Sequence, residues 1–301
     1  MSAADPEHWP KITVVTPSFR QAQFLETTIL SVLGQCYPNL EYIIMDGGSD
    51  DGSVEIIKRY AGQLAYWQSA RDAGQADAIN HGFARATGDI LCWLNSDDYF
   101  LPGTLRTVAQ RFANATDRPA LLYGSCLCFR ESDASARILR ARPHDPQLLR
   151  ETDYIYQPSS FWTKALWDKN GPLDAELHFG FDWDWFIRAM SHCDFMMQEG
   201  LLSAYRRHAA HKSGSGGKRR NDEILRVVRR HGSSEQIRAY EYASSKSGDF
   251  EKRNQLINRL KGWRVPYAAT LGRALTPGLW SLPDGVSRAT FDRCMGMLAS
   301  T

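Results

Sequence analysis

The sequence predicts an α/β protein with a mainly parallel central sheet, and two observations lead to this fold class. In the N-terminal third, β-branched and apolar runs alternate with segments of helical periodicity. This β-α-β-α alternation is typical of right-handed crossover units, whose strands are parallel. In addition, apolar runs stop at Asp46 and at Asp97–Asp98, as strands do when their carboxyl ends face a ligand.

The first strand is expected at 12–16, a β-branched run that Pro17 ends. A helix follows over 23–35, where apolar side chains recur at helical spacing until Gly34. The second strand, 42–45, places Asp46 at its carboxyl end.

The later elements follow from the same patterns of periodicity and turn residues. Further strands are predicted at 64–68, 90–94, 120–129, 159–162 and 195–205. Further helices are predicted at 53–60, 76–86, 102–112, 163–169, 179–188, 222–230 and 234–260. Residues 130–152 are polar and weakly periodic, so we expect loops there with a helical piece near 147–150.

Composition limits the class of protein. The chain has 301 residues, of which 43% are hydrophobic and 23% charged, as in an ordinary globular protein. A net charge of +2 argues against an electrostatic nucleic-acid binder. No apolar run is long enough to cross a membrane, and the N-terminus is too polar for a signal peptide. Six cysteines without metal or disulfide spacing indicate a reducing, cytoplasmic setting.

The stretch from Gly88 to Phe100 carries the strongest chemical signal. Its apolar run ends in Asn-Ser-Asp-Asp, so Asp97 and Asp98 stand together at the end of a buried strand. Adjacent carboxylates repel and are costly to bury, whereas a divalent cation removes that cost. Oxygen ligands suit Mg²⁺ or Mn²⁺, which indicates a phosphate-bearing substrate. The alternative is a helix N-cap ahead of Pro102.

Five segments, in one order along the chain, resemble the family-two inverting glycosyltransferases, whose nucleotide-binding fold is called GT-A. The matching segments are Val14–Ser18, Tyr42–Ser53, Asp72–Gly82, Gly88–Asp98 and Asp182–Arg188. The resemblance covers residues 11–213, and the rest of the chain carries no motif of the family.

This resemblance implies a metal-dependent enzyme that uses Mn²⁺ or Mg²⁺. Such an enzyme moves a sugar from a nucleotide-sugar, first of all a UDP-sugar, to a hydroxyl of a glycan or lipid-linked acceptor. The implied setting is surface polysaccharide or glycolipid assembly. A sugar-nucleotide nucleotidyltransferase is an alternative, although the loop after the first strand lacks that class's glycines. A catalytically inactive nucleotide- or glycan-binding module is another.

The resemblance also implies roles for individual residues. Asp98 is aligned as the direct metal ligand, His208 completes the metal shell, and Asp97 contacts the ribose or donor sugar. The segment departs from the family's Asp-X-Asp pattern, because Asn95 stands at a position that is often Asp. The expected nucleotide-binding residues are Thr16, Pro17, Ser18, Asp46, Asp72, Gly74, Gln75, Asn80 and Asp97. For Asp46 the alternative is a turn-forming role, and for Asn80 a structural one.

Asp182 is implied to be the general base that takes the proton of the acceptor hydroxyl. The family often has Glu before this Asp, and here Phe181 replaces it, so Asp184 remains a second choice. Trp183 and Asp184 are expected to contact the acceptor. The alternatives are helix-dipole stabilisation for the acids and core packing for the tryptophan.

The resemblance and composition together suggest three parts. Residues 1–211 form the GT-A catalytic domain, with its nucleotide-binding part at 11–100 and its acceptor part at 101–211. Residues 212–220 form a flexible basic linker or lid, and 221–301 a mostly helical extension. That extension permits peripheral membrane association or oligomer formation, with Trp263 and Trp280 as candidates for an interfacial helix.

Overall fold

The computed structural model describes residues 9–208, 211–212, 216–246, 249, 252, 255–257, 259–260 and 282–299. Contacts divide the chain into two compact units. The first comprises residues 1–149 and 153–211, and the second residues 150–152 and 212–301. The functional division of the catalytic domain stays a prediction.

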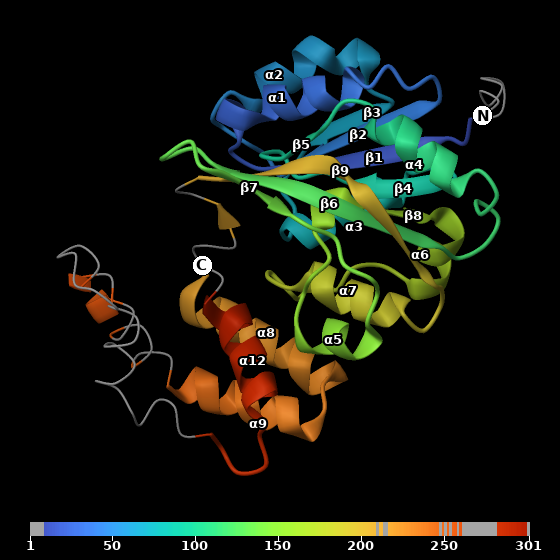
Figure 1. The fold of residues 1–301 in the computed structure, drawn as a ribbon. Helices are drawn as coiled ribbons and strands as arrows, with labels where there is room; N and C mark the ends of the chain where they lie inside the picture. Colours follow the sequence, from blue (N-terminus) through green and yellow to red (C-terminus); the bar gives the residue numbers. More distant parts are fainter. Residues whose placement is uncertain are drawn as a thin grey trace. The chain divides into compact units, whose positions relative to one another are not determined.

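Strands of the described residues form one nine-stranded sheet in the order β3-β2-β1-β4-β8-β6-β9-β5, with β7 paired to β6 (Figure 1). The bounds are β1 Ile12–Ser18, β2 Leu40–Asp46, β3 Tyr66–Ser69, β4 Ile90–Trp93, β5 Tyr99–Phe100, β6 Leu121–Arg130, β7 Ala136–Leu139, β8 Ser160–Thr163 and β9 Phe195–Arg207. Strands β1 to β4 pair in parallel, as do β6 and β9, whereas β8 runs antiparallel to β4 and β6. The predicted α/β fold with a mainly parallel sheet is confirmed.

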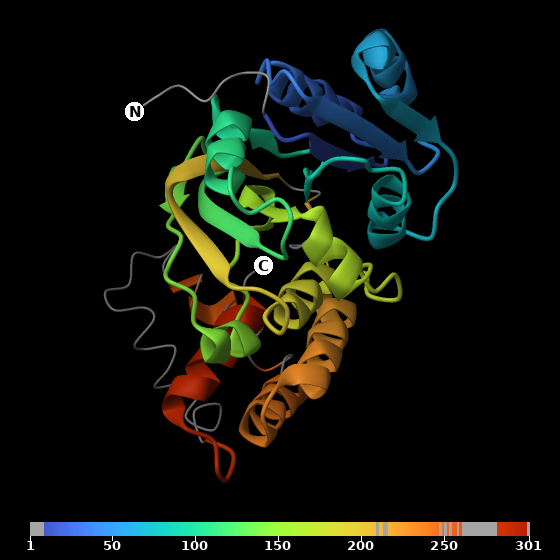
Figure 2. The ribbon, with the colours of Figure 1, turned by 90° about the vertical axis from the view of Figure 1, so that its right-hand side faces the viewer.

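Helices cover both faces of the parallel strands. The helices up to β9 are α1 Ala22–Leu33, α2 Ser53–Tyr60, α3 Gln75–Phe83, α4 Thr104–Phe112, α5 Pro146–Glu151, α6 Lys164–Asn170 and α7 Phe181–Ala189, with 3-10 turns η2 Ala61–Gln63 and η3 Gln157–Ser159. All lie in the first unit except the last two residues of α5. In Figures 1 and 2, α1 and α2 lie on one side of β1 to β3, and α3 lies on the other.

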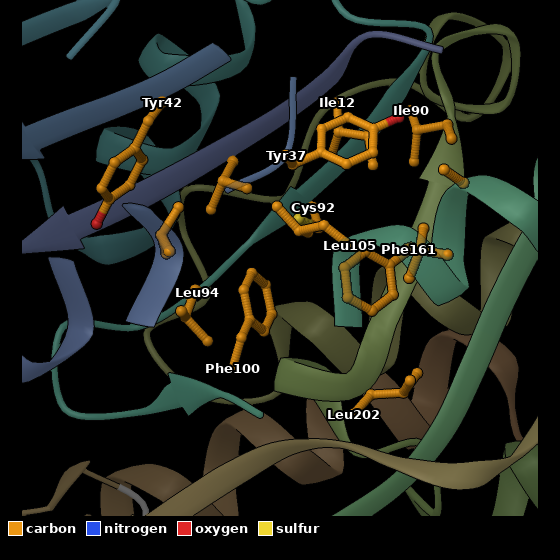
Figure 3. Packing of buried hydrophobic residues seen from close by; sticks show 14 of the residues in the cluster. Ile12, Tyr37, Tyr42, Ile90, Cys92, Leu94, Phe100, Leu105, Phe161 and Leu202 are labelled. Atoms are coloured by element: carbon orange, nitrogen blue, oxygen red, sulfur yellow. The ribbon is translucent and has the colours of Figure 1, made fainter. Parts of the chain in front are cut away.

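Strand β1 is buried along its whole length, and its side chains alternate between the two faces. Val14 belongs to a core cluster with Leu25 and Ile29 of α1, and Figure 3 shows Ile12, Cys92 and Phe161 in the same cluster. Val15 faces Gly82 of α3, and a Cβ atom added to Gly82 would lie 2.4 Å from the Cγ1 atom of Val15. This close approach explains a glycine inside α3.

The prediction for residues 130–152 missed a strand. Residues 136–139 form β7, which pairs with β6 although its own side chains are mostly exposed. Its four residues, Ala-Arg-Ile-Leu, are too few to show the alternation of apolar and polar residues that identifies a strand. The short β5 was missed as well, because two residues carry no periodicity.

The second unit is helical, with α8 Gly217–His231, α9 Ser234–Ser245 and α12 Arg288–Ala299. Helix α8 begins at Gly217 rather than at the predicted Asp222, so Lys218, Arg219 and Arg220 lie inside it. Lys218 pairs with Asp222.

Arg219 pairs with Glu223, and the buried Arg220 donates to the Met297 carbonyl oxygen. Residues 217–220 of the predicted flexible basic linker or lid at 212–220 therefore belong to helix α8. Residues 213–215, 263 and 280 lie outside the described residues. No helix among the described residues is long and apolar enough to cross a membrane.

One buried carboxylate ties the beginnings of β1, β2 and β4 together. Glu41 accepts hydrogen bonds from the Thr13 hydroxyl at 2.6 Å and from the backbone and hydroxyl of Thr87 at 2.7 and 2.6 Å. Lys11 lies 2.9 Å from the same carboxylate. Burial alone would raise the pKa of Glu41, but these donors lower it to about 2.

We expect Glu41→Gln to lower the free energy of unfolding at pH 7 by about 2–3 kcal/mol. The pKa of Glu41 is lower in the folded state, so its contribution is present above the unfolded value of 4.5 and is lost as the pH falls toward about 2. Urea unfolding of wild type and variant from pH 7 to pH 2.5 measures whether their free energies of unfolding become equal as the pH falls. The exposed Glu55→Gln is the control, and a Glu41 difference that does not depend on pH would contradict the assignment.

Candidate active site

The carboxyl ends of four parallel strands bring most of the predicted nucleotide-binding residues to one edge of the sheet. Ser18 of β1 lies opposite Asp46 of β2, which lies opposite Ser69 of β3. On the other side of β1, β4 leads directly into Asn95 and Asp97. Open α/β sheets bind ligands at this edge, where strand order reverses around β1.

Asp46 performs the turn-forming role that was its alternative. Its carboxylate accepts hydrogen bonds from the backbone of Gly48 and Ser49, and from the hydroxyls of Ser49 and Ser69, at 2.6–3.1 Å. The residue is 3% exposed. The structure therefore places Asp46 as the organiser of the loop after β2, and a contact with the nucleobase stays a prediction.

Asp72 lies beside this loop. One of its carboxylate oxygens accepts from the Gly74 backbone at 2.9 Å, and the other would lie 2.8 Å from a Cβ atom at Gly47. Burial raises the pKa of Asp72, and the charges of Asp77 and Asp46 raise it further against the opposing Gly74 hydrogen bond. A glycine at 47 is therefore needed to leave room for the Asp72 side chain. Gly47 and Asp72 lie next to the end of β1, and we call this pair the floor of the candidate site.

The side chain of Phe19 extends over the same floor. It is 55% exposed and lies 3.3 Å from the Cβ position of Gly47. Nearby, the Ser18 hydroxyl is buried and has no hydrogen-bond partner in the described part of the chain. An exposed ring beside an unsatisfied buried hydroxyl is suited to a planar polar ligand such as a nucleobase. The sequence prediction missed Phe19, although an aromatic residue just after a strand end was a visible signal.

Asn80 has the structural role that was its alternative. Its side-chain amide donates to the Leu173 carbonyl oxygen at 2.9 Å and accepts from the Leu173 backbone at 3.0 Å. This pair of hydrogen bonds fixes the segment before α7 to α3. Thr16 is also fully buried, with its hydroxyl 3.1 Å from that of Tyr42, so only its backbone is left for a ligand.

The loop after β4 separates the two adjacent carboxylates. Asp97 turns toward His208, with 3.0 Å between its Oδ2 atom and the imidazole Nε2 atom. Asp98 turns inward, is fully buried, and accepts from the Arg206 backbone at 3.0 Å and the Asn95 amide at 3.4 Å. Burial raises the pKa of Asp98 well above its ordinary value, and the charge of Asp97 raises it further.

The predicted metal pair of Asp98 and His208 stays a prediction, and the geometry favours Asp97 as the carboxylate beside His208. The sequence could not show that the second carboxylate faces the interior, because that depends on where β9 meets the loop. His208 contacts Asp97 instead, and its ring packs on Phe24 at 4.4 Å between centroids.

Asp97 and His208 fit a divalent cation. Neighbouring ligand atoms of an octahedral ion are about 3.0 Å apart when each lies about 2.1 Å from the metal, and their observed separation is 3.0 Å. Carboxylate oxygen and imidazole nitrogen both suit Mn²⁺. Among the described residues, no group of three His, Cys, Asp or Glu side chains converges, so further ligands would come from substrate phosphates and water.

Arg206 holds the acidic loop in place. Its Nε atom donates to the Asp97 carbonyl oxygen at 3.0 Å, and its Nη1 atom lies 2.7 Å from Glu131. The guanidinium also lies 4.8 Å from the ring centroid of Phe24 and 5.0 Å from that of Phe129. The sequence analysis used Arg206 only as the end of a strand and missed this role.

A chain of side-chain amides connects the loops around the site. Gln75 donates to Asn95 at 2.7 Å, and Asn95 donates to Gln157 at 3.3 Å. Gln157, in η3, donates in turn to the Trp93 carbonyl oxygen at 2.8 Å. The predicted residue Gln75 therefore positions Asn95. Gln157 is a buried polar residue that no sequence pattern singled out.

Along helix α7, the residue predicted as the general base and those predicted to contact the acceptor have different surroundings. Asp182 is half-buried in the first turn, after Phe181, whose ring lies 6.1 Å from that of Trp93 at the end of β4. The first turn of α7 is thus fixed beside the strand that leads to Asp97.

Asp184 and Trp183 point into the protein, which corrects their predicted contact with the acceptor. Trp183 is fully buried and donates to the Leu149 carbonyl oxygen at 2.6 Å. The Asp184 side chain is 3% exposed and pairs with Arg188 at 3.0 Å. Arg188 also donates to the carbonyl oxygens of Asn170 and Pro172. The pair fixes the preceding loop, which gives Asp184 a structural role. Its use as the second choice for the base stays a prediction, which this contact does not favour.

Comparison with known proteins agrees with this arrangement. A sequence model described as Glycosyl transferase family 2 matches residues 13–139. An uncharacterized glycosyltransferase of Mycobacterium tuberculosis is 30% identical over 190 residues, covering 62% of this chain and 71% of that protein. A Campylobacter jejuni protein named GalNAc(5)-diNAcBac-PP-undecaprenol beta-1,3-glucosyltransferase is 28% identical over 130 residues, 42% of this chain and 41% of that one.

Two solved structures share the fold, which confirms the GT-A prediction. TarS of S. aureus, in complex with UDP-GlcNAc, gives a TM-score of 0.56 at 17% identity over 96% of this chain and 90% of that one. The mannosyltransferase PcManGT of Pyrobaculum calidifontis, with GDP-Man and Mn²⁺, gives 0.58 at 18% identity over 98% and 89%.

We expect Asp184→Ala to lower the free energy of unfolding by about 3 kcal/mol, because it leaves Arg188 without its buried counter-charge. Asp168→Ala is the matched control, since Asp168 forms an exposed i,i+4 pair with Lys164 and should change stability by less than about 0.5 kcal/mol. Urea denaturation at pH 7 measures both variants. Equal, small effects would contradict a structural role for Asp184.

Proposed function

Since the chain belongs to glycosyl transferase family 2, we propose that it is a metal-dependent inverting glycosyltransferase that uses a nucleotide-sugar donor. The observation that carries this proposal is the contact between Asp97 and His208 at the carboxyl edge of the parallel strands. Family membership leaves no support for the alternative of a nucleotidyltransferase.

In this proposal Asp97 and His208 hold Mn²⁺ or Mg²⁺. When bound, the cation stabilises the negative charge of the departing nucleoside diphosphate. Asp98 keeps the loop in shape through its contacts with Asn95 and Arg206, and is not itself a ligand. The nucleobase lies against Phe19, with the Ser18 hydroxyl and the Asp72 carboxylate as polar partners on the floor below.

Asp182 acts as the general base. As the acceptor oxygen attacks the anomeric carbon, its proton passes to the Asp182 carboxylate, while the bond to the diphosphate breaks on the opposite face. The anomeric configuration inverts because the acceptor oxygen attacks on the face opposite the leaving diphosphate, and this single displacement needs one base. Supporting this assignment, the start of α7 packs on Trp93, two residues before Asn95.

We propose a UDP-sugar as donor and a glycan or lipid-linked hydroxyl as acceptor, in surface polysaccharide or glycolipid assembly. The UDP-GlcNAc complex of TarS and the undecaprenol-linked substrate in the name of the Campylobacter protein support this choice. PcManGT is in complex with GDP-Man, so the identity of the donor's nucleobase must be tested. A lipid-linked acceptor would place the enzyme at the cytoplasmic face of a membrane as a peripheral protein.

We expect the protein to release nucleotide slowly from one member of a panel of UDP-, GDP-, dTDP- and CDP-sugars, with Mn²⁺ or Mg²⁺ and not with EDTA. Asp97→Asn should lower that rate at least a hundredfold, because one of the two metal-holding groups is lost. Asp98→Asn should lower it less than tenfold. A larger loss of rate in Asp98→Asn than in Asp97→Asn would favour Asp98 as the metal ligand. The absence of both nucleotide release and metal-dependent nucleotide binding would refute the proposed glycosyltransferase activity.

We expect Asp182→Asn to lower nucleotide release at least a hundredfold, within the range typical of a lost general base. Donor affinity should stay within threefold, because Asp182 contacts the acceptor side of the reacting carbon. Stopped assays for rate and calorimetric titration of the donor separate the two effects. An unchanged rate would favour an inactive binding module or a different base.

A further inference from the structure

The two units of the chain carry opposite net charges. Residues 212–301, which make up nearly all of the second unit, hold 17 Lys and Arg against 8 Asp and Glu, a net charge of +9. Residues 1–211 hold 19 Lys and Arg against 26 Asp and Glu, a net charge of −7. The overall charge of +2 therefore hides a strong separation. Such asymmetry is typical of a protein whose basic part contacts a polyanion or an anionic surface.

Helix α8 gathers part of this positive charge on one face. The opposite face is buried and mostly apolar, and α8 packs against α9 (Figure 1). The exposed face extends along the whole helix, because its charged residues recur at intervals of three, four and seven positions. It carries five cations and one acid: Lys218, Arg219, Asp222, Arg226, Arg229 and Arg230. We call the five cations the basic stripe.

Helix stability does not account for the start of the basic stripe. Lys218 and Arg219 stand in the first turn of α8, which has no acidic residue. The positive end of the helix dipole disfavours cations at this place. Both cations pair with acids four positions later, Asp222 and Glu223, at 2.7 and 3.1 Å. A pair with its cation nearer the N-terminus is the weaker arrangement. The two cations thus stand where the helix gains least from them, as expected of residues that serve an external partner.

The ion pairs of the basic stripe leave it positive and open to other anions. At the far end, Arg229 lies 2.7 Å from Glu241 of α9. Lys218 and Arg229 remain 85% and 58% exposed in their pairs, and exposed pairs of this kind are weak. Between them, Arg226 is exposed and has no ion-pair partner in the part of the chain that the structure describes. A surface that presents several anions at once can therefore contact the stripe along its length.

We propose that the basic stripe of α8 binds the protein to the anionic surface of a membrane, through the phosphate groups of acidic lipids. This role rests on the glycosyltransferase function proposed above, because a lipid-linked acceptor lies at such a surface. The contact is electrostatic, since the apolar face of α8 is buried within the protein and does not insert into lipid. Anionic lipids repel the negative residues 1–211, so the second unit is the part that they attract.

Binding to vesicles tests the basic stripe without any catalysis. The vesicles are phosphatidylcholine with and without about one third of phosphatidylglycerol, and bound protein is measured by sedimentation. The stripe variant is Lys218→Gln/Arg226→Gln/Arg230→Gln. The matched control removes three exposed cations of the first unit and is Lys58→Gln/Arg111→Gln/Arg118→Gln.

We expect the wild type and the control to bind the anionic vesicles and not the neutral ones. The stripe variant should bind about tenfold more weakly than the wild type, because it loses three of the five cations that face the lipid phosphates. Wild-type binding should weaken as NaCl rises from about 0.05 M to about 0.3 M, since salt screens exposed charges. Circular dichroism and a thermal melt verify that the variants are folded.

Three results would overturn the proposed membrane surface. They are the absence of wild-type binding to anionic vesicles, equal binding by the stripe variant, and tighter wild-type binding to a double-stranded RNA than to the vesicles. The last result would identify a nucleic acid as the partner. Failure here is distinct from failure of the proposed function, because nucleotide release from the donor in solution requires no membrane. A wild type that releases nucleotide but ignores vesicles would lose only the surface.

Discussion

The site depends on how the protein accommodates two adjacent carboxylates at the end of a buried strand. Repulsion and desolvation disfavour placing both in one environment. The structure separates them: Asp97 meets His208 near the surface, and Asp98 is enclosed. Arg206 makes this possible, because its backbone donates to Asp98 while its guanidinium holds the Asp97 carbonyl oxygen. Since Arg206 and His208 come from the end of β9 and the residue after it, the geometry of the acidic loop depends on that long strand.

Because of this dependence, elements from several parts of the first unit together fix the geometry of the acidic loop. Strand β9 pairs with β6 over ten positions and with β5 directly after the acidic loop. The amides of Gln75 and Gln157 fix Asn95 from two other elements. Each of these amide hydrogen bonds is partly buried, and its loss would leave a polar partner unsatisfied. The site is therefore shaped before any ligand binds, as catalysis by preorganised charge requires.

Much of this architecture could be predicted from the sequence, and the misses have physical causes. Alternating periodicity located the parallel strands, and acidic residues after apolar runs located their functional edge. Periodicity could not say which of Asp97 and Asp98 faces inward, because Arg206 lies more than a hundred residues away. Nor could it orient α7, where polar and aromatic residues adjoin: Asp184 is buried by its pairing with Arg188, and Trp183 by its hydrogen bond to Leu149. Strand β7 stayed hidden because its four residues, whose side chains are mostly exposed, are too few to show an alternation.

The same exposure has a consequence for which side chains of the first unit can change. The groups that would hold a donor are tied into buried networks, so substitution there disturbs the fold. Arg137 lies on the edge strand β7 and Arg142 lies beyond its end. Both side chains are exposed, while β6 holds the backbone of this segment. Their side chains can change at little cost in stability, because surface substitutions away from such networks rarely matter. The side chains of this edge can therefore vary while the hydrogen bonds that fix the acidic loop stay the same.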